Sequence, residues 1–371
     1  METLTLSQTA KEEGSINWNQ IYSLVALNAA VVISWIAYHN YQPKVLEIFN
    51  FQELALFLVV AQCVILVCIP PIAGLVGDYM IKTNGNRFIV FTVGTSVTAM
   101  VFMCVAFTVG TAGTLNFTAA LPIMIVVWLI SMNIFHSPAN SMMELFADAK
   151  QLPTAMALMT LTTELLYALE PLVVWFVDEI GPVSTFALGG VLLIVTGYFF
   201  RSTTKNIKLS RDYEETKARI SNYPLVLTVG LFLGLATGII INAFPDLLAV
   251  RLKEYSNTML GGSHFVSIIL GVAALAAWPL STVVTQIGMK QSVTIGAIAT
   301  FFFILIVYFT TDPIYCGISC VMLGLSYSLF NVSAFPYILT NLSARSVTFG
   351  AGIFFGSVEL ADGLMNIFDK I

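Results

Sequence analysis

The chain is too apolar for a water-soluble domain: of its 371 residues, 57% are hydrophobic and 10% are charged, and the mean hydropathy is +0.87. The formal net charge is −5, and no basic surface indicates a nucleic-acid partner. The five cysteines lie within apolar runs and lack the spacing of metal ligands. The sequence therefore favours a membrane protein without a metal or cofactor.

Many apolar runs are long enough to cross a lipid bilayer. A helix needs about 20 apolar residues to cross the hydrocarbon core, and its backbone must be hydrogen-bonded within the segment. The N-terminal segment shows no basic-then-apolar cleavage signal, so the first span is expected to be retained. We predict an all-α polytopic protein with eleven spans, at 18–41, 51–76, 88–110, 115–137, 153–177, 183–200, 224–249, 264–285, 293–310, 313–336 and 347–367.

One long polar segment divides the spans into two groups. We predict an N-terminal helical half at 1–200, a linker at 201–223 and a C-terminal helical half at 224–371. Placing the N-terminus inside puts twelve of the sixteen Lys and Arg residues on the cytoplasmic side, six of them in the linker. The positive-inside rule therefore predicts a cytoplasmic N-terminus, in a plasma or bacterial inner membrane.

The two halves repeat short patterns in the same order. The matching residues are Asn40 and Asn242, Asn133 and Asn331, and Glu164 and Glu359, at offsets of 202, 198 and 195. A slow drift of the offset is expected where equivalent loops differ slightly in length. Each match alone is weak, but three in one order indicate parallel halves, the architecture of several transporter folds.

The loop after the second span carries a recognisable pattern. Two glycines and an acidic residue lie where the apolar run ends, and a glycine and a basic residue follow in the turn. The five residues are Gly74, Gly77, Asp78, Gly85 and Arg87. The pattern resembles the signature loop of the major facilitator superfamily, although a few extra residues separate Asp78 from Gly85. The resemblance implies that Asp78 and Arg87 form a cytoplasmic latch; the alternative is an ordinary interfacial loop. With the repeat and the topology in agreement, the chain resembles this superfamily over essentially its whole length.

The resemblance implies two pseudo-symmetric halves of six helices, and one helix is missing from this count. The partner of the span at 183–200 would begin near position 378, beyond the last residue. Two alternatives follow: the chain is truncated, or the protein has eleven spans.

Two carboxyl groups are expected near the middle of the membrane. Glu164 and Glu359 each lie about a dozen residues into their spans, and Asp362 follows Glu359 on the same helical face. A carboxylate at that depth costs about 2.5 kcal/mol or more, and no Lys or Arg lies in the middle of a span to pair with it. We predict that these three residues bind protons or sodium for coupling. The alternative for each Glu is a protonated side chain that holds neighbouring helices together.

In the superfamily the first, fourth, seventh and tenth helices line the central cavity. Carried over by span, this implies a set of cavity or gate residues: Tyr38, Asn40, Asn133, His136, Asn242 and Asn331. Lys44 and Asp246 occupy equivalent places in the two halves and have opposite charge, so a salt bridge between them is a hypothesis for closing the outside. His136, next to Ser137 and Pro138, is expected to cap a helix end rather than to transfer protons.

These observations predict a secondary active transporter, not an enzyme, since motifs such as HExxH and GxSxG are absent from the sequence. The favoured interpretation is proton-coupled symport of a small polar solute, such as a sugar, by alternating access. One alternative is a proton-coupled exporter of cationic or amphipathic compounds. Another is a transporter-like receptor or assembly scaffold. Anionic solutes are disfavoured because no Lys or Arg lies in the middle of a span.

Overall fold

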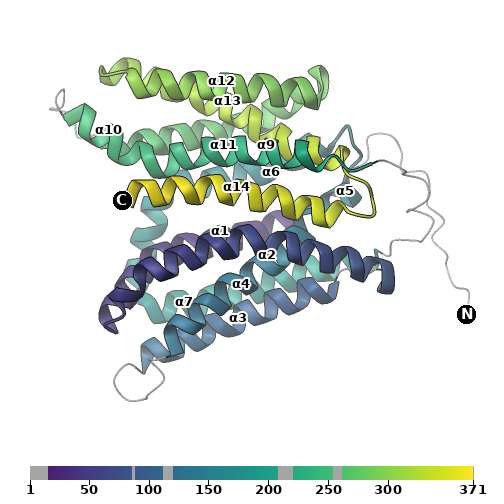
Figure 1. Cartoon of the computed structure of the whole chain (residues 1–371), viewed down its shortest axis with the longest axis vertical. Helices are drawn as coiled ribbons and strands as arrows, with labels where there is room; N and C mark the ends of the chain where they lie inside the picture. The colour runs from purple at the N-terminus through teal and green to yellow at the C-terminus, as the bar shows by residue number, and fades with distance from the viewer. Residues whose placement is uncertain (1–15, 86–87, 112–119, 208–219, 254–260, 371) are drawn as a thin grey trace, which may run out of the picture.

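The computed structural model describes residues 16–85, 88–111, 120–207, 220–253 and 261–370, and it consists almost entirely of long helices (Figure 1). Within these ranges, the β-structure is a single isolated bridge between Ile16 and Ala147. The fold is therefore all-α, as the apolar runs predict.

The first group of helices covers the predicted N-terminal half. Its elements are α1 (Trp18–Ile48), η1 (Gln52–Leu54), α2 (Ala55–Asn84), α3 (Phe88–Gly110), α4 (Leu121–Asn140), α5 (Met143–Phe146), α6 (Leu152–Ala168) and α7 (Glu170–Thr204). The helix α1 continues through Pro43, whereas the sequence places the end of the first span at residue 41. The helix α2 ends at Gly85, whose φ of 70° is the left-handed conformation that favours glycine.

The second group covers the predicted C-terminal half. Its elements are α9 (Tyr223–Gly238), the π-helix η3 (Ile239–Ala243), α10 (Phe244–Lys253), α11 (Gly262–Ile287), α12 (Met289–Phe309), α13 (Pro313–Thr340) and α14 (Val347–Lys370). The elements α9, η3 and α10 follow one another directly and together form the seventh span.

The fifth and sixth spans are joined without a loop. The helix α7 contains a break at Gly181, where φ is 77° and ψ is 167°. The break frees the carbonyl of Val177, which accepts hydrogen bonds from the hydroxyls of Tyr41 at 2.8 Å and Thr185 at 3.2 Å. The fifth span therefore consists of α6 and the first part of α7, and the sixth span of the rest of α7.

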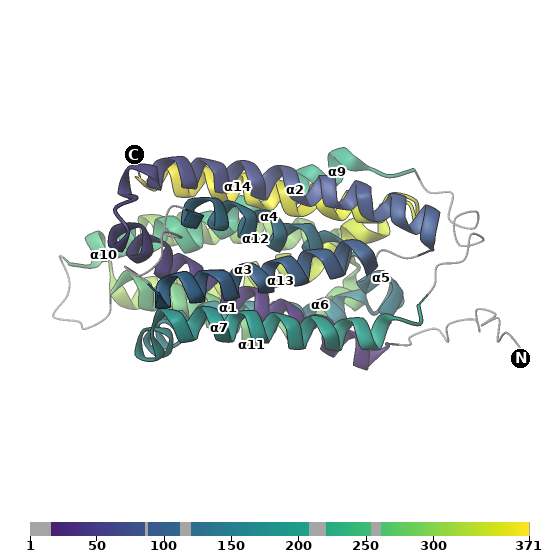
Figure 2. The same cartoon turned by 90° about the horizontal axis from the view of Figure 1, so that it is seen from below.

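The described helices account for all eleven predicted spans. Ten stretches are individually long and apolar enough to cross a membrane, and α7 is counted once among them although it contains parts of two spans. The helices run roughly side by side (Figure 2). We call the end of the bundle where α1 begins the N side, and the other end the far side; α5 lies at the N side and α10 at the far side (Figure 1).

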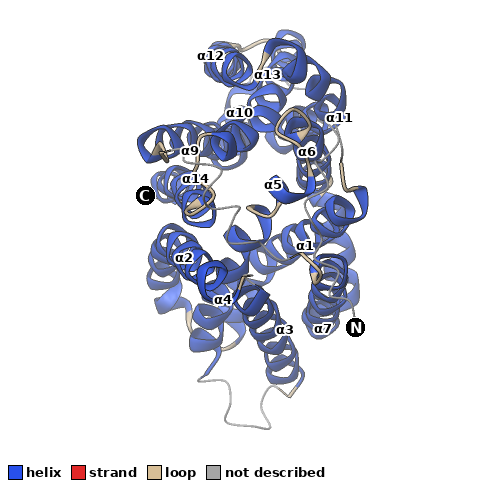
Figure 3. Cartoon of the chain, turned by 90° about the vertical axis from the view of Figure 1, so that its right-hand side faces the viewer, coloured by secondary structure: helices blue, strands red, loops and turns tan. Residues whose placement is uncertain are grey.

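Two pairs of helices bring the groups together. Viewed along the helices, α2 lies beside α14, and α6 lies beside α11 (Figure 3). We call these contacts the α2–α14 seam and the α6–α11 seam. The division of the chain at 201–223 stays a prediction, since residues 208–219 lie outside the described ranges.

Candidate transport pathway

Glu164 forms a polar contact between the two groups of helices. It lies on α6 and is 3% exposed, and its Oε1 accepts a hydrogen bond of 2.8 Å from Nδ2 of Asn331 on α13. Its Oε2 is buried and has no hydrogen-bond partner among the described residues. A buried carboxylate oxygen without a donor is costly, so the site favours a protonated carboxyl or a bound positive charge.

Polar side chains from neighbouring helices surround Glu164. Asn28 on α1 donates to the Thr163 hydroxyl at 2.7 Å. The hydroxyls of Tyr327 on α13 and Thr237 on α9 are 2.9 Å apart. Tyr327 lies within electrostatic range of Glu164. Polar groups of α1 and α6 are thus bonded to each other, as are polar groups of α9 and α13.

A second carboxyl group lies on α14. Asp362 accepts a hydrogen bond of 3.0 Å from Nδ2 of Asn242, which lies in the π-helix η3. A π turn changes the direction of the side chains that follow it and is frequent at functional sites. Glu359, one turn away on α14, is only partly buried. The structure therefore brings together two residues that the sequence predicted separately, Asn242 and Asp362.

Tyr167 lies near both carboxyl groups, those of Glu164 and Asp362. Its phenol, on α6, lies within electrostatic range of Glu359, Asp362, Glu164 and Glu170. Tyr327 lies within range of Glu164, Asp362 and Tyr167. Titratable side chains of α6, α13 and α14 therefore lie within electrostatic range of one another where the two groups of helices meet.

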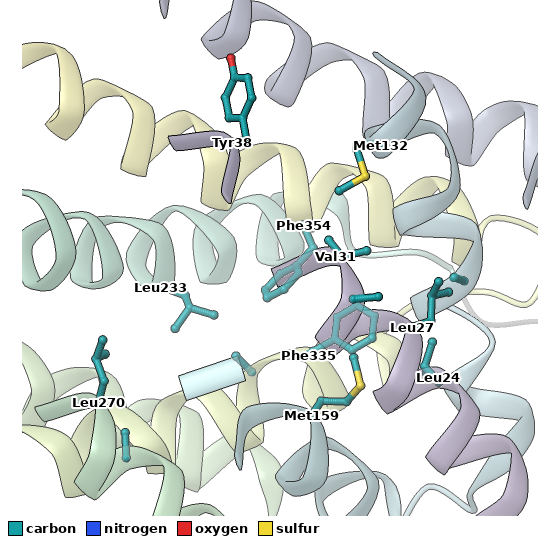
Figure 4. Close-up of a cluster of buried hydrophobic side chains, with 14 of the residues drawn as sticks. Leu24, Leu27, Val31, Tyr38, Met132, Met159, Leu233, Leu270, Phe335 and Phe354 are labelled. Atoms are coloured by element: carbon teal, nitrogen blue, oxygen red, sulfur yellow. The ribbon is translucent and has the colours of Figure 1, made fainter. Parts of the chain in front are cut away.

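Buried apolar side chains lie on the N side of Glu164 and Asn331. Phe335 on α13 and Met159 on α6 lie four and five residues closer to the N side than Asn331 and Glu164, a rise of about 6–7.5 Å. The cluster is buried and draws on both groups of helices (Figure 4), with labelled members Leu24, Leu27, Val31, Met132, Met159, Phe335 and Phe354 between these elements. A packed apolar cluster excludes water, so it separates the carboxyl group of Glu164 from the N side.

The signature loop joins the same two groups at the N side. The carboxylate of Asp78 accepts hydrogen bonds from the backbone N–H groups of Thr348 at 3.1 Å and Phe349 at 2.8 Å. These are the first N–H groups of α14, where a negative charge is favoured. The predicted latch partner Arg87 lies outside the described residues.

The glycines of the signature loop allow two backbones to touch. A Cβ on Gly74 would collide with the carbonyl oxygen of Thr348, and a Cβ on Gly352 would collide with that of Pro70. Gly77 faces the Thr348 side chain, where a Cβ would lie at 2.9 Å. Small residues let membrane helices approach closely in this way.

The predicted gate residues of α1 bind within their own half. Asp178 on α7 accepts hydrogen bonds from Lys44 Nζ at 2.8 Å and from Asn40 Nδ2 at 2.9 Å. Lys44 is therefore paired with Asp178 and not with Asp246, which lies exposed on α10. A Lys44–Asp246 bridge stays a prediction for another state of the protein.

The three other predicted cavity residues, Asn133, Tyr38 and His136, contact different parts of the structure. Asn133 is buried and donates to the carbonyl of Leu129 in its own helix at 2.8 Å. Tyr38 is buried against Trp128, with ring centroids 4.5 Å apart, and lines a small apolar cavity of about 30 Å³ inside the N-terminal group. The capping prediction for His136 is wrong: α4 continues to Asn140, and the His136 ring packs on Phe355 of α14 at 4.4 Å.

Sequence reasoning missed several residues of the pathway. Asn28 is a polar residue within an apolar span, Tyr167 follows Glu164 by three residues, and Tyr327 precedes Asn331 by four. Residues three or four apart share a helix face, so this spacing could have indicated both tyrosines. Asp178 had no comparable signal, because its role depends on the break at Gly181.

The arrangement agrees with a known family. The model of the Major Facilitator Superfamily matches residues 20–363. The chain belongs to this superfamily. Comparison with curated protein sequences gives no match.

Two solved structures share the fold of this superfamily member. The crystal structure of the human organic anion transporter MFSD10 (TETRAN) has a TM-score of 0.68 at 11% identity, covering 94% of this chain and 92% of that one. The crystal structure of the E. coli fucose:proton symporter FucP has a TM-score of 0.60 at 12% identity, covering 93% and 97%. At such identities the likeness extends to the fold alone. The family makes the chain a multi-pass secondary transporter, and not an enzyme.

Proposed function

We propose that this protein moves a small polar solute across the membrane by alternating access, coupled to protons that bind Glu164. The observation that supports the proposal best is the hydrogen bond between Glu164 and Asn331, which joins the two groups of helices. A carboxyl group that bridges two moving bodies changes its surroundings whenever they separate. Protonation and conformation are then linked.

The coupling follows from the environment of the carboxyl. In the structure, Glu164 is buried and its second oxygen lacks a donor, which favours the protonated form. If the α6–α11 seam opens on the N side, Asn331 moves away and water reaches the carboxyl. Water stabilises the carboxylate, so the proton leaves on that side.

We further propose that the halves 1–200 and 224–371 rock about the two seams and that the N side faces the cytoplasm. Under this proposal the structure is closed to the cytoplasm by the apolar cluster around Phe335. The positive-inside count of Lys and Arg supports the orientation. The contact of Asp78 with α14 supports a latch that exists when the N side is closed.

The proposal is tested with purified protein in liposomes that contain a pH-sensitive dye. Wild-type protein and Glu164→Gln are compared with a panel of sugars and organic cations. We expect a solute to drive proton flux in the wild type, and Glu164→Gln to lose at least about 90% of that flux, because the amide cannot carry a proton. The variant Glu179→Gln, which removes an exposed carboxyl from the far end of the fifth span, is the matched control.

Two results would overturn the proposal. Solute transport without proton movement in the wild type would show that the carrier is uncoupled or uses another ion such as sodium. No transport of any solute, together with stable capture of one partner protein, would favour a receptor or scaffold.

A further inference from the structure

An aromatic contact joins the two groups of helices at the N side. The indole of Trp18, the first residue of α1, lies 6.3 Å from the indole of Trp278 on α11, and the two ring planes are inclined by 33°. Trp18 is also stacked on Tyr22 of its own helix, with ring centroids 5.8 Å apart. Rings of the N-terminal group thus touch a ring of the C-terminal group.

The Trp18–Trp278 contact lies beside the α6–α11 seam. The helix α6 packs on both α1 and α11. Ala277, which precedes Trp278, is fully buried in a small cluster with Ala157 of α6 and Val332 of α13. Trp278 itself is exposed on the outer surface of the bundle, as is Tyr22. The seam therefore has an inner layer of small buried side chains and, beside it, an outer layer of aromatic rings.

The outer layer faces lipid, and this decides what the ring contact contributes. Tryptophan and tyrosine are favoured near the membrane surface. Burial of an apolar side chain gains little in a bilayer, because acyl chains are as apolar as a neighbouring helix. What remains is the packing of one ring on the other, which changes an equilibrium by a factor of about two to ten. This contribution exists only while α1 and α11 are in contact.

The two seams are held at the N side by different kinds of contact. On the α2–α14 seam, the carboxylate of Asp78 accepts hydrogen bonds from the backbone N–H groups of Thr348 and Phe349. Beside the α6–α11 seam, the contact between the groups of helices is the aromatic pair Trp18 and Trp278.

We propose that the Trp18–Trp278 contact is a second latch, which keeps the α6–α11 seam closed at the N side and sets how often the pathway opens there. The inference rests on the proposed function in one respect, the opening of this seam on the N side. Opening moves α11 away from α1, so the two indoles part before water passes Met159 and Phe335. Loss of either ring therefore shifts the protein toward the state that is open at the N side.

The inference is tested on the full chain in lipid nanodiscs through a native side chain. Met159 is buried in the apolar cluster of the N side (Figure 4), so water reaches it when that side opens. Hydrogen peroxide oxidises a methionine thioether to the sulfoxide, and the initial rate at Met159 is followed by peptide mass spectrometry. We expect Trp18→Leu and Trp278→Leu each to raise this rate about two- to tenfold, because leucine stays apolar but removes the ring pair.

Two controls separate opening of the seam from other effects. Trp175→Leu replaces a tryptophan that is exposed on α7, and it should leave the oxidation rate of Met159 unchanged. Met143 is fully buried on α5 and reports unfolding, so its oxidation should stay at the wild-type rate in every variant.

The double variant Trp18→Leu/Trp278→Leu distinguishes a latch from two independent membrane anchors. Two residues that act through one contact are not additive, so the double variant should oxidise Met159 no faster than either single variant. The inference is overturned by rates that multiply in the double variant, by an equal increase in Trp175→Leu, or by no increase in the two single variants.

This inference and the proposed function fail in different ways. If the tryptophan variants leave the oxidation of Met159 unchanged while Glu164→Gln loses the solute-driven proton flux, the latch is wrong and the coupling stands. If the tryptophan variants speed the oxidation of Met159 but Glu164→Gln keeps the flux, coupling through Glu164 is wrong and the latch stands.

Discussion

The two seams between the groups of helices are built in different ways. Along the α2–α14 seam, glycines bring the backbones into direct contact, as at Gly74 and Gly352. Along the α6–α11 seam the approach is looser: a Cβ on Gly271 would lie 3.9 Å from the Ala168 side chain. The polar contact next to this looser seam is the Glu164–Asn331 hydrogen bond.

The two equivalent glutamates, one beside each seam, also differ in their contacts. Glu164 is buried and bonded across the groups, while Glu359, 195 residues later, is partly buried and has no hydrogen-bond partner among the described residues. The repeat supplies Asn133 as the equivalent of Asn331, but Asn133 donates within α4. The repeated sequence therefore yields one carboxyl that is bonded across the two groups of helices and one without a hydrogen-bond partner among the described residues.

The largest effect is expected from adding a methyl group to the tight seam. In Gly74→Ala the new Cβ collides with the backbone of Thr348, which cannot rotate away, and overpacking of this kind costs about 1–3 kcal/mol. We expect a lower melting temperature and slow transport, measured by thermal unfolding and by liposome flux. Gly271→Ala is the control and should change stability by less than about 0.5 kcal/mol, since its Cβ makes ordinary contact. Equal decreases in melting temperature for Gly74→Ala and Gly271→Ala would show that the two seams are packed equally tightly.

A smaller difference is expected between the two equivalent asparagines. Asn331→Leu leaves a buried carboxyl of Glu164 without its donor, at a cost of about 1–3 kcal/mol. Asn133→Leu removes only a bond to its own helix and should cost less than about 1 kcal/mol. Denaturant unfolding in detergent compares the two, and the Glu164→Leu/Asn331→Leu pair should be more stable than Asn331→Leu alone. A larger decrease in the free energy of unfolding for Asn133→Leu than for Asn331→Leu would contradict the assignment of Asn331 as the donor to Glu164.

The next effect concerns the contact of Asp78 with the start of α14 on the α2–α14 seam. Asp78→Ala removes both acceptors at the start of α14, and loss of such a cap costs about 0.5–2 kcal/mol. We expect faster exchange of the Thr348 and Phe349 amide hydrogens, measured by mass spectrometry. Gln286→Ala, which removes an exposed polar side chain near the end of α11, should leave exchange unchanged. Unchanged protection in Asp78→Ala would show that α14 begins independently of α2.

The smallest effect is expected at the far side of the N-terminal group. Lys44→Met breaks an ion pair whose side chains are 47% and 45% exposed. Exposed ion pairs are screened by water and contribute little. The melting temperature should stay within experimental error of the wild type at low and high salt. A clear decrease would indicate that Lys44 also acts in another state, as the predicted contact with Asp246 requires.

The spans could be predicted from sequence because hydrophobic length is a local property. Their ends were less predictable: the first span was predicted to end at residue 41, yet α1 continues to Ile48, and the fifth span is divided between α6, which ends at Ala168, and α7, which begins at Glu170. Glu164, Glu359 and Asp362 were predicted as buried acids from depth alone. The partner of each polar group depends on how helices far apart in sequence pack, so Asn331 with Glu164, or Lys44 with Asp178, could not be derived from the repeat.

The turn at Gly181 has a mechanical consequence. No loop separates the fifth span from the sixth, and the carbonyl of Val177 freed there is bonded to Tyr41 of α1. The far ends of the first, fifth and sixth spans are thereby held together. A tilt of the fifth span would therefore move the sixth span as well, because no loop between them could absorb it. The sixth span would pass the displacement on to α3, with which it is in contact.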